Sequence, residues 1–325
     1  MPNLLSRLIA VALCALPIAA AHSADFPSRP IRLVVPFAPG GVTDTGARIV
    51  ADKLGQRLGQ TVVVENRPGA AGNIGTQAVV NAEPDGYTLV VGFDGTIVIN
   101  PHVYTKIGFD PLKDFTPVSK IGDAVLILVA NPKVPVKTLQ ELIAYSKAQP
   151  NGVSYGSAGT GSTPHLGGEL FKLRTGAKLE HIPYKGGGQA MTDVVGGTIP
   201  LLYTAVAGAY PFVQKDQVRA LAVSSKQRLA SLPDVPTFEE SGVPDFEVNS
   251  WIGILAPKGT PAPITHKLQE NIRAVVMEPA TRERLAGLGI VSSGNTPEEF
   301  GQQIREDLAK YEAVVKQVGI KVDGS

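Results

Sequence analysis

The chain has 325 residues, of which 30 are Lys or Arg, 29 are Asp or Glu and 43% are hydrophobic. This length fits about two domains. The net charge of +1 excludes a general nucleic-acid binder, because neutralising phosphates requires a basic face. The hydrophobic content excludes an intrinsically disordered chain, whose signature is low hydrophobicity with high net charge.

The N-terminus has the pattern of an export signal. Arg7 precedes an apolar run over residues 8–21, which ends in small residues suited to signal peptidase. The alternative is a membrane anchor, but the run is shorter than the ~20 residues that span a bilayer and it contains Pro17. We therefore expect residues 1–24 to be a signal peptide and the mature protein to be periplasmic.

Removal of this segment changes the chemistry of the chain. Cleavage is expected after Ala24, with Ala21 and Ser23 as alternatives. It takes away Arg7 and no acid, so the mature chain has 29 basic and 29 acidic residues. It also takes away Cys14, the one cysteine, which excludes a disulfide or a cysteine-based metal site.

Short β-branched runs alternate with helical patterns in the first half of the mature chain. Strands are predicted at 31–35, 61–65 and 87–92, and helices at 44–58 and 74–81. This βαβ pattern indicates a parallel sheet. Right-handed crossovers then place the loops that follow the strands along one sheet edge.

A second α/β series follows in the second half. The apolar run Ala124–Ala130 predicts a buried strand that leads into it. Further strands are predicted at 153–156, 179–183, 199–203, 218–223 and 248–256, and helices at 138–149, 164–174, 187–195, 265–277 and 296–318. The fold class is α/β with two similar halves, and the C-terminal helices are expected to pack back on the first half.

Two glycine-rich loops between a strand and a helix are the candidate ligand-binding elements. The first covers residues 36–44 and the second 155–165. Their glycines allow close approach of a ligand to the backbone, and the free N–H groups at a helix start can bind an anion. In the first loop, Asp44 alternatively only caps the helix. In the second, His165 is expected to anchor the helix or line the cleft rather than to catalyse a reaction.

Motifs of the common enzyme classes do not fit. A nucleophile elbow needs glycine two residues before the serine, where Ser157 has Tyr155 and Ser162 has Thr160. The chain has no phosphate-binding loop, dinucleotide fingerprint or HExxH motif, so we expect no metal and no cofactor. A periplasmic hydrolase that pairs Ser157 or Ser162 with His165 is a weak alternative to a binding protein.

Several motifs in matching order resemble those of the tripartite tricarboxylate transporter substrate-binding proteins, the TctC or Bug family. They are residues 29–44, 65–70, 84–89, 155–166, 181–186 and 232–237, within a resemblance that runs from about 26 to 320. The resemblance implies a type II-like two-lobed periplasmic binding protein that closes on a ligand in the cleft between its lobes. The second lobe is inserted in the first, with lobe 1 at 25–128 plus 252–325 and lobe 2 at 129–251.

The resemblance also implies the site residues and the partners. The ligand is expected to be a small di- or tricarboxylate or an aromatic acid. Membrane subunits similar to TctA and TctB are the expected partners of a monomeric protein, and docking on a sensor kinase is the alternative output. The implied ligand-binding residues are Phe37, Pro39, Gly40, Gly41 and Asp44 in the first loop, Ser157, Gly159, Gly161, Ser162, Thr163 and His165 in the second, and Asp193.

Two segments depart from the family pattern. Residues 203–207 (YTAVA) stand where an acidic or amide residue and a small-residue segment are common, and residues 93–96 (FDGT) replace a serine-rich loop. An apolar or aromatic ligand body would be tolerated at the first segment. The identity of the ligand therefore cannot be copied from relatives.

Overall fold

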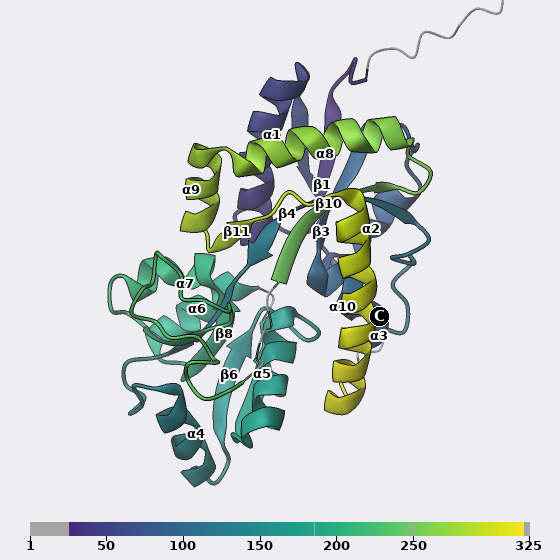
Figure 1. Ribbon diagram of the computed structural model, residues 1–325. Coiled ribbons are helices and arrows are strands. Elements are labelled where there is room, and N and C mark those ends of the chain that lie inside the picture. Colours follow the sequence, from purple (N-terminus) through teal and green to yellow (C-terminus); the bar gives the residue numbers. More distant parts are fainter. Residues whose placement is uncertain (1–25, 185, 245, 247, 249, 322–325) are drawn as a thin grey trace, which may run out of the picture.

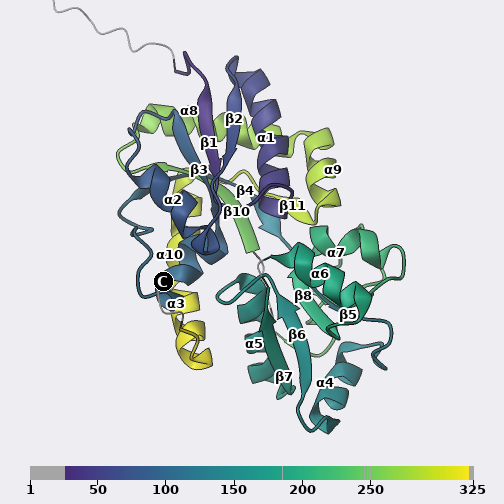
Figure 2. The same cartoon turned by 180° about the vertical axis from the view of Figure 1, so that it is seen from behind.

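The computed structural model describes residues 26–184, 186–244, 246, 248 and 250–321. Within these residues the chain forms two β-sheets with helices on their faces, and the sheets belong to two lobes (Figures 1 and 2). The expected signal peptide, residues 1–24, lies outside the described residues. In the described part of the chain, no helix is both long and apolar enough to cross a membrane.

The first lobe is built on a mixed six-stranded sheet with the order β11-β4-β10-β3-β1-β2. β1 pairs in parallel with β2 and β3, as the βαβ pattern predicted, whereas β10 runs antiparallel to β3 and β4. β4 and β11 were not predicted. The strands are β1 (Ile31–Val35), β2 (Val62–Asn66), β3 (Thr88–Phe93), β4 (Phe115–Ala124), β10 (Ser250–Pro257) and β11 (Ile290–Ser292).

Helices from both ends of the chain cover this sheet. α8 packs against α1 and β4, and α10 packs against β4, so the C-terminal helices return to the first lobe as expected (Figure 1). They are α1 (Val42–Leu58), α2 (Asn73–Val80), α3 (Asn100–Val103), α8 (Ala262–Met277), α9 (Pro279–Gly287) and α10 (Pro297–Val318), with the short turns η2 (Ala70–Gly72) and η3 (Gly95–Ile99), the latter π-helical.

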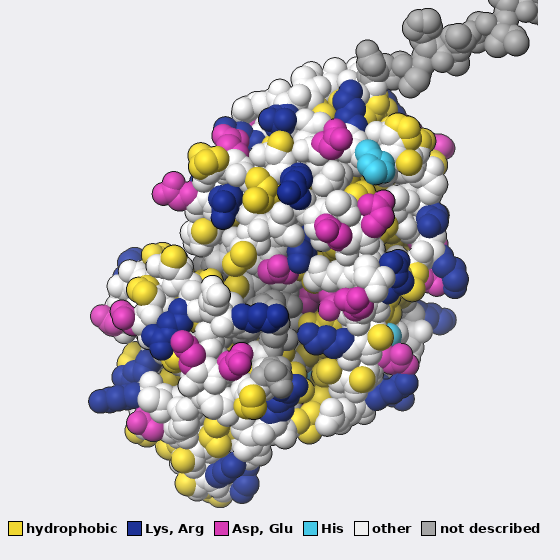
Figure 3. Space-filling view, viewed as in Figure 1, with side chains coloured by type: hydrophobic (Ala, Val, Ile, Leu, Met, Phe, Trp, Pro, Cys, Tyr) yellow, Lys and Arg dark blue, Asp and Glu magenta, His cyan; other side chains and the backbone are white. Residues whose placement is uncertain are grey.

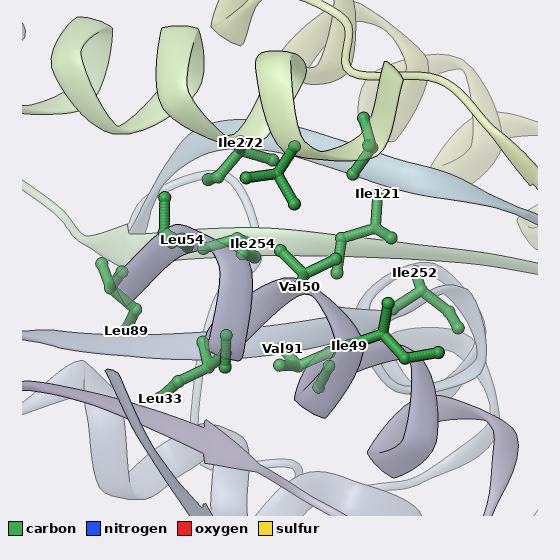
Figure 4. Packing of buried hydrophobic residues seen from close by; sticks show 14 of the residues in the cluster. Leu33, Ile49, Val50, Leu54, Leu89, Val91, Ile121, Ile252, Ile254 and Ile272 are labelled. Atoms are coloured by element: carbon green, nitrogen blue, oxygen red, sulfur yellow. The ribbon is translucent and has the colours of Figure 1, made fainter. Parts of the chain in front are cut away.

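One apolar core joins α1, α8 and the sheet. Val50 and Leu54 come from α1, Ile272 comes from α8, and Ile252 and Ile254 come from β10 (Figure 4). These side chains are all fully buried. Burial of aliphatic surface of this kind contributes about 25 cal/mol per Å², so the return of the C-terminal segment is a large part of what stabilises the lobe.

The second lobe has a five-stranded sheet with the order β7-β6-β8-β5-β9. β6 is parallel to β7 and β8, and β5 is antiparallel to β8 and β9. The strands are β5 (Leu126–Ala130), β6 (Val153–Ser157), β7 (Leu179–Pro183), β8 (Leu201–Ala205) and β9 (Arg219–Val223). The helices are α4 (Leu139–Ala148), α5 (Thr163–Thr175), α6 (Gly187–Gly196) and α7 (Val206–Val213).

The chain passes between the sheets twice. The first passage is the single residue Val125, whose N–H donates to Gly289 O (3.0 Å) and whose carbonyl accepts from the N–H of Val206 (2.9 Å). The second passage leads back into β10. The run Ala124–Ala130 is thus two strands rather than the one predicted, because Val125 is itself buried and no polar residue marks the junction.

The expected lobe boundaries both fall within strands. The boundary at residue 128 falls inside β5, because the change of sheet occurs at Val125. The boundary at residue 252 falls inside β10, which begins at Ser250. Both strands are almost continuously apolar, so their pattern does not show where one sheet ends and the other begins.

Candidate ligand-binding site

The two glycine-rich loops follow the carboxyl ends of parallel strands in different lobes. The first connects β1 to α1, and the second connects β6 to α5. Phe37 of the first loop packs edge-to-face on Phe93 at the end of β3, with ring centroids 5.4 Å apart. The next residue, Asp94, accepts a hydrogen bond from Thr163 at the start of α5. The ends of β1 and β3 and the start of α5 therefore meet at the junction of the lobes.

The first loop presents its backbone to solvent. Pro39, Gly40 and Gly41 are exposed, and a Cβ added at either glycine would meet no atom within 4 Å. Gly41 is the N-cap of α1 and has no side chain to satisfy the first N–H groups of the helix. These N–H groups have no partner within a helix, and the helix dipole makes its N-terminus attractive to anions. The loop therefore has the geometry of an anion-binding element.

Asp44 holds the first loop in shape. Its carboxylate accepts hydrogen bonds from the N–H of Gly40 (2.9 Å), from Arg48 Nε (3.0 Å) and from Asn66 Nδ2 (2.8 Å). Gly40 adopts a φ of +89°, which favours glycine. Because Asp44 is only 3% exposed and fully engaged, the geometry supports the alternative that it organises the helix start rather than touching a ligand.

The charge on Asp44 is stabilised by the same contacts. Burial on its own would raise the pKa of the Asp44 carboxyl, but the hydrogen bonds from Arg48, Gly40 and Asn66 outweigh it and lower the pKa below its usual range. The carboxylate is therefore ionised at neutral pH, and its hydrogen bonds are at full strength there.

The hydroxyl groups of Ser157 and Ser162 in the second loop are engaged in hydrogen bonds within the second lobe. Ser157 Oγ lies 2.6 Å from His181 Nε2 and accepts from the N–H of Gly159 (3.1 Å). Ser162 is the N-cap of α5, accepting from the N–H of His165, and its hydroxyl donates to Gly159 O (2.7 Å). Ser157 and Ser162 therefore help to fix the conformation of the loop.

The glycines of the second loop adopt conformations that other residues avoid. Gly159 has a φ of +126° and Gly161 a φ of +79°. The N–H of Gly161 donates to His165 Nδ1 (3.1 Å), and a Cβ at Gly161 would lie 3.2 Å from Val103 of α3 in the other lobe. Gly161 therefore lies where the second loop packs on the first lobe.

The structure brings together a different serine and histidine from those expected of a hydrolase. His165 accepts from the backbone of Gly161 and is not the partner of either serine side chain through its ring. Ser157 pairs with His181 instead, and it is fully buried. A nucleophile must reach a substrate carbonyl, so the pairing of Ser157 or Ser162 with His165 is wrong for this fold.

Asp193 lies on α6 in the second lobe. It is half-buried, and its Oδ2 accepts from the hydroxyl of Tyr184 (2.7 Å). Burial, together with this bond and the nearby carboxylate, raises the pKa of Tyr184 to about 12. This hydrogen bond joins the loop after β7 to α6. The carbonyl of Tyr184 lies near Gly159, so the loop after β7 also borders the second loop.

Asp94, Ser250 and His181 were not singled out as site residues. Asp94 lies in the segment 93–96, and the departure of that segment from the family pattern was the one feature of the sequence that pointed to it. Groups of three or more His, Asp, Glu or Cys able to hold a metal ion do not occur among the described residues. On the face shown in Figure 3, basic and acidic side chains are interspersed over both lobes.

Two α/β lobes, each with a mixed sheet, joined by two passages of the chain, define the periplasmic binding protein fold. The model of the family described as "Tripartite tricarboxylate transporter family receptor" matches residues 46–320. The chain belongs to this family. It is a TctC-family solute-binding protein, and the family is one of receptors rather than enzymes.

Individual relatives agree with this assignment. BugT of Bordetella pertussis is 39% identical over 307 residues, which cover 94% of each chain. The structure of Rpa4515 of R. palustris with adipate is 35% identical, with a TM-score of 0.86 over 91% of this chain and 99% of that one. The structure of the periplasmic binding protein BugD is 36% identical, with a TM-score of 0.83 over 92% and 100%. MatC from Rhodopseudomonas palustris with bound malate is 33% identical, with a TM-score of 0.81 over 89% and 100%.

Proposed function

We propose that this protein captures a small organic carboxylate between its lobes, with a di- or tricarboxylate or an aromatic acid as the ligand. The observation that carries the proposal is the start of α1, where exposed Gly40 and Gly41 leave the first N–H groups of the helix uncapped. Relatives described with adipate and with malate support the same class of ligand.

The two loops would hold the ligand from opposite lobes. In this proposal the first loop binds a carboxylate through backbone N–H groups around Gly41, and the second loop does so through residues 158–163. Helix N-termini supply local positive potential without Lys or Arg, which suits a chain with balanced charge. Closure of the lobes about Val125 and the return into β10 would then enclose the ligand.

A thermal-shift screen tests the ligand class. A ligand that binds only the folded state raises the melting temperature by mass action. We expect adipate, malate or an aromatic acid to raise it, and the corresponding uncharged amides to leave it unchanged. If carboxylates have no effect while sugars, amino acids or cations raise the melting temperature, the proposed ligand class is wrong.

We propose that the protein delivers its ligand to membrane transporter subunits, which requires its export from the cytoplasm. Deleting the gene should reduce uptake of the ligand, whereas a role as a sensor partner would change transcription and leave uptake intact. The mass of the protein recovered from the periplasm should correspond to a chain that begins at Asp25. A full-length chain retained in the membrane would contradict export by a cleaved signal.

A further inference from the structure

One buried carboxyl group connects both lobes and the passage between them. Asp94 follows β3 directly and has no exposed surface. Its Oδ2 accepts from the hydroxyl of Thr163 (2.7 Å), the first residue of α5 in the second lobe. Its Oδ1 accepts from the hydroxyl of Ser250, where the chain re-enters the first lobe in β10. Asp94 therefore ties the start of the second lobe's α5 to the first lobe and to the passage into β10.

The electrostatic surroundings of Asp94 disfavour a negative charge. Asp307 and Tyr311, both on α10, interact electrostatically with Asp94, and neither is cationic. Thr163 and Ser250 from α5 and β10 are neutral donors. Burial raises the pKa of Asp94 to about 7, the hydrogen bonds from Ser250, Thr163 and Gly95 oppose this rise, and Asp307 adds to it.

The hydrogen bonds of Asp94 survive its protonation. A serine or threonine hydroxyl both donates and accepts, so one of the two bonds can reverse when the carboxyl carries a proton. In an open form, where water reaches Asp94, its pKa would return toward the ordinary value for aspartate, about 4. Closing the lobes and binding a proton at Asp94 therefore favour each other.

We propose that Asp94 is a positioning residue of the ligand-binding site, which in its protonated form holds the second loop against the first lobe, so that lower pH favours the closed, ligand-binding form. The ligand part of this inference rests on the proposed function, whereas the contact between the lobes does not. An anionic ligand beside Thr163 adds a like charge and strengthens the preference of Asp94 for its proton.

The variant D94N is the matched test, because the amide has the shape of the acid, keeps one donor and one acceptor, and cannot ionise. D94A removes both bonds, and D52N, at an exposed position on α1, makes the same charge change elsewhere. Hydrogen–deuterium exchange in the peptide 158–166 reports closure without any ligand. We expect this peptide in the wild-type protein to be several times less protected at pH 8 than at pH 6 after correction for intrinsic exchange.

The variants separate the proposal from a purely structural role. D94N should keep wild-type protection at pH 6 and lose its pH dependence, D94A should be poorly protected at both values, and D52N should behave as wild type. If the protection of the peptide still depends on pH in D94N, or if the wild-type protein is equally protected at pH 6 and pH 8, the proposal is overturned. T163V should lower protection at both values, because it removes the partner of Asp94 in the second lobe.

The affinity for a ligand is an independent test of the proposal, with adipate and malate as the probes. Calorimetry of wild type should show about fivefold tighter binding at pH 6 than at pH 8 if the ligand raises the pKa of Asp94 by one further unit, and D94N should show no such difference. If neither probe binds while the exchange results hold, adipate and malate are excluded as ligands and the role of Asp94 stands. If a probe binds with equal pH dependence in wild type and D94N, the role of Asp94 fails and the ligand class stands.

Discussion

The imidazole ring of His165 is stacked on that of His181, with centroids 3.7 Å apart and planes inclined by 15°. Burial lowers the pKa of His165 to about 4, and burial together with His165 lowers that of His181 to about 3. Both rings are therefore neutral at physiological pH, and His165 Nδ1 can accept the hydrogen bond from Gly161. The conformation of the second loop thus depends on an unprotonated histidine pair.

This pair predicts acid sensitivity. An unfolded histidine binds a proton near pH 6.5 and the folded ones only near 4 and 3, so the unfolded state takes up protons first as the pH falls. The part of the free energy of unfolding that depends on neutral histidines is complete above pH 6.5 and is lost as the pH falls toward 4, by up to about 1.4 kcal/mol per pH unit for His165. We expect the free energy of unfolding, measured with urea between pH 4.5 and 7.5, to change less steeply with pH for His165→Gln than for wild type.

Asp94 acts in the opposite direction over part of this range. Its pKa is raised in the folded state, so its contribution is greatest at low pH and is lost as the pH rises toward 7. The contribution of each group to the pH dependence is therefore obtained from the difference in the free energy of unfolding between wild type and the variant of that group. His266→Gln, at an exposed position, is the control, and its free energy of unfolding should depend on pH as in wild type. If the pH dependence of His165→Gln is also that of wild type, the prediction is wrong.

Gly41→Asp tests the anion-binding role of the first loop. The position is exposed, has an ordinary backbone conformation, with φ −74°, and has no atom within 4 Å of an added Cβ, so the fold should tolerate the change. A carboxylate there repels an anionic ligand, and we expect at least a tenfold loss of affinity by calorimetry. Gly41→Ala controls for the side chain and should lose less than threefold. Equal affinities for the two variants would remove the charge argument.

Gly161→Asp is a poorer test. Its φ of +79° and the contact of an added Cβ with Val103 predict a disturbed loop whatever the charge of the new side chain. Loss of binding in that variant would not distinguish repulsion of the ligand from misplacement of the loop, so the first loop carries the decisive substitution.

Asp44→Asn should destabilise the protein by about 1–3 kcal/mol, because an amide cannot accept from Arg48, Gly40 and Asn66 together. The pKa of Asp44 is lowered on folding, so its contribution is complete above about pH 4 and is lost as the pH falls through the folded value. Urea unfolding at pH 7 and at pH 3 should show the gap between wild type and variant closing with acid. A gap that is equal at both pH values would contradict this account.

Two adjacent glycines in α5 are predicted to be intolerant of any side chain. A Cβ at Gly167 would lie 2.1 Å from Tyr203, and one at Gly168 would lie 2.3 Å from Tyr155. Both tyrosines are buried and cannot move away without disturbing the sheet. Gly167→Ala and Gly168→Ala should each cost about 1–3 kcal/mol in thermal unfolding.

The control for these substitutions is Gly196→Ala at the end of α6, where an added Cβ meets nothing within 4 Å. Alanine is the better helix former, so this variant should be neutral or more stable by up to about 1 kcal/mol. If all three alanine variants have the same melting temperature, close packing of α5 on the sheet is not what selects glycine at 167 and 168.

Local patterns were sufficient for elements whose signals lie within a few residues. Thr296 and Glu299 form a capping box at the start of α10, and Thr138 caps α4 by accepting from the N–H of Glu141, so both helix starts rest on residues three positions apart. The strand β4 escaped prediction because it contains Pro117 and polar residues that tertiary contacts satisfy. Its Ser119 and Lys120, for example, both bond to Asn295, which is more than 170 residues away in sequence.

The same distinction applies to the site. The loops after β1 and β6 could be identified because glycine before a helix start is a local signal. The contacts of Asp94 could not be identified, since Thr163 is 69 residues away and Ser250 is 156 residues away. The structure was also needed to show that Ser157 and Ser162 shape their own loop, because hydroxyl-rich sequences carry no information on which hydroxyls are already engaged.

The position of β10 between β3 and β4 determines the order in which the molecule can be assembled. β4 ends at Ala124 and β10 begins at Ser250, so the centre of the first sheet joins segments separated by the whole second lobe. The strands of the second lobe come from one continuous stretch, residues 126–223, and can associate as soon as that stretch is available. The first lobe, although it starts the chain, is therefore completed last, because its long-range pairings must wait for the C-terminal segment.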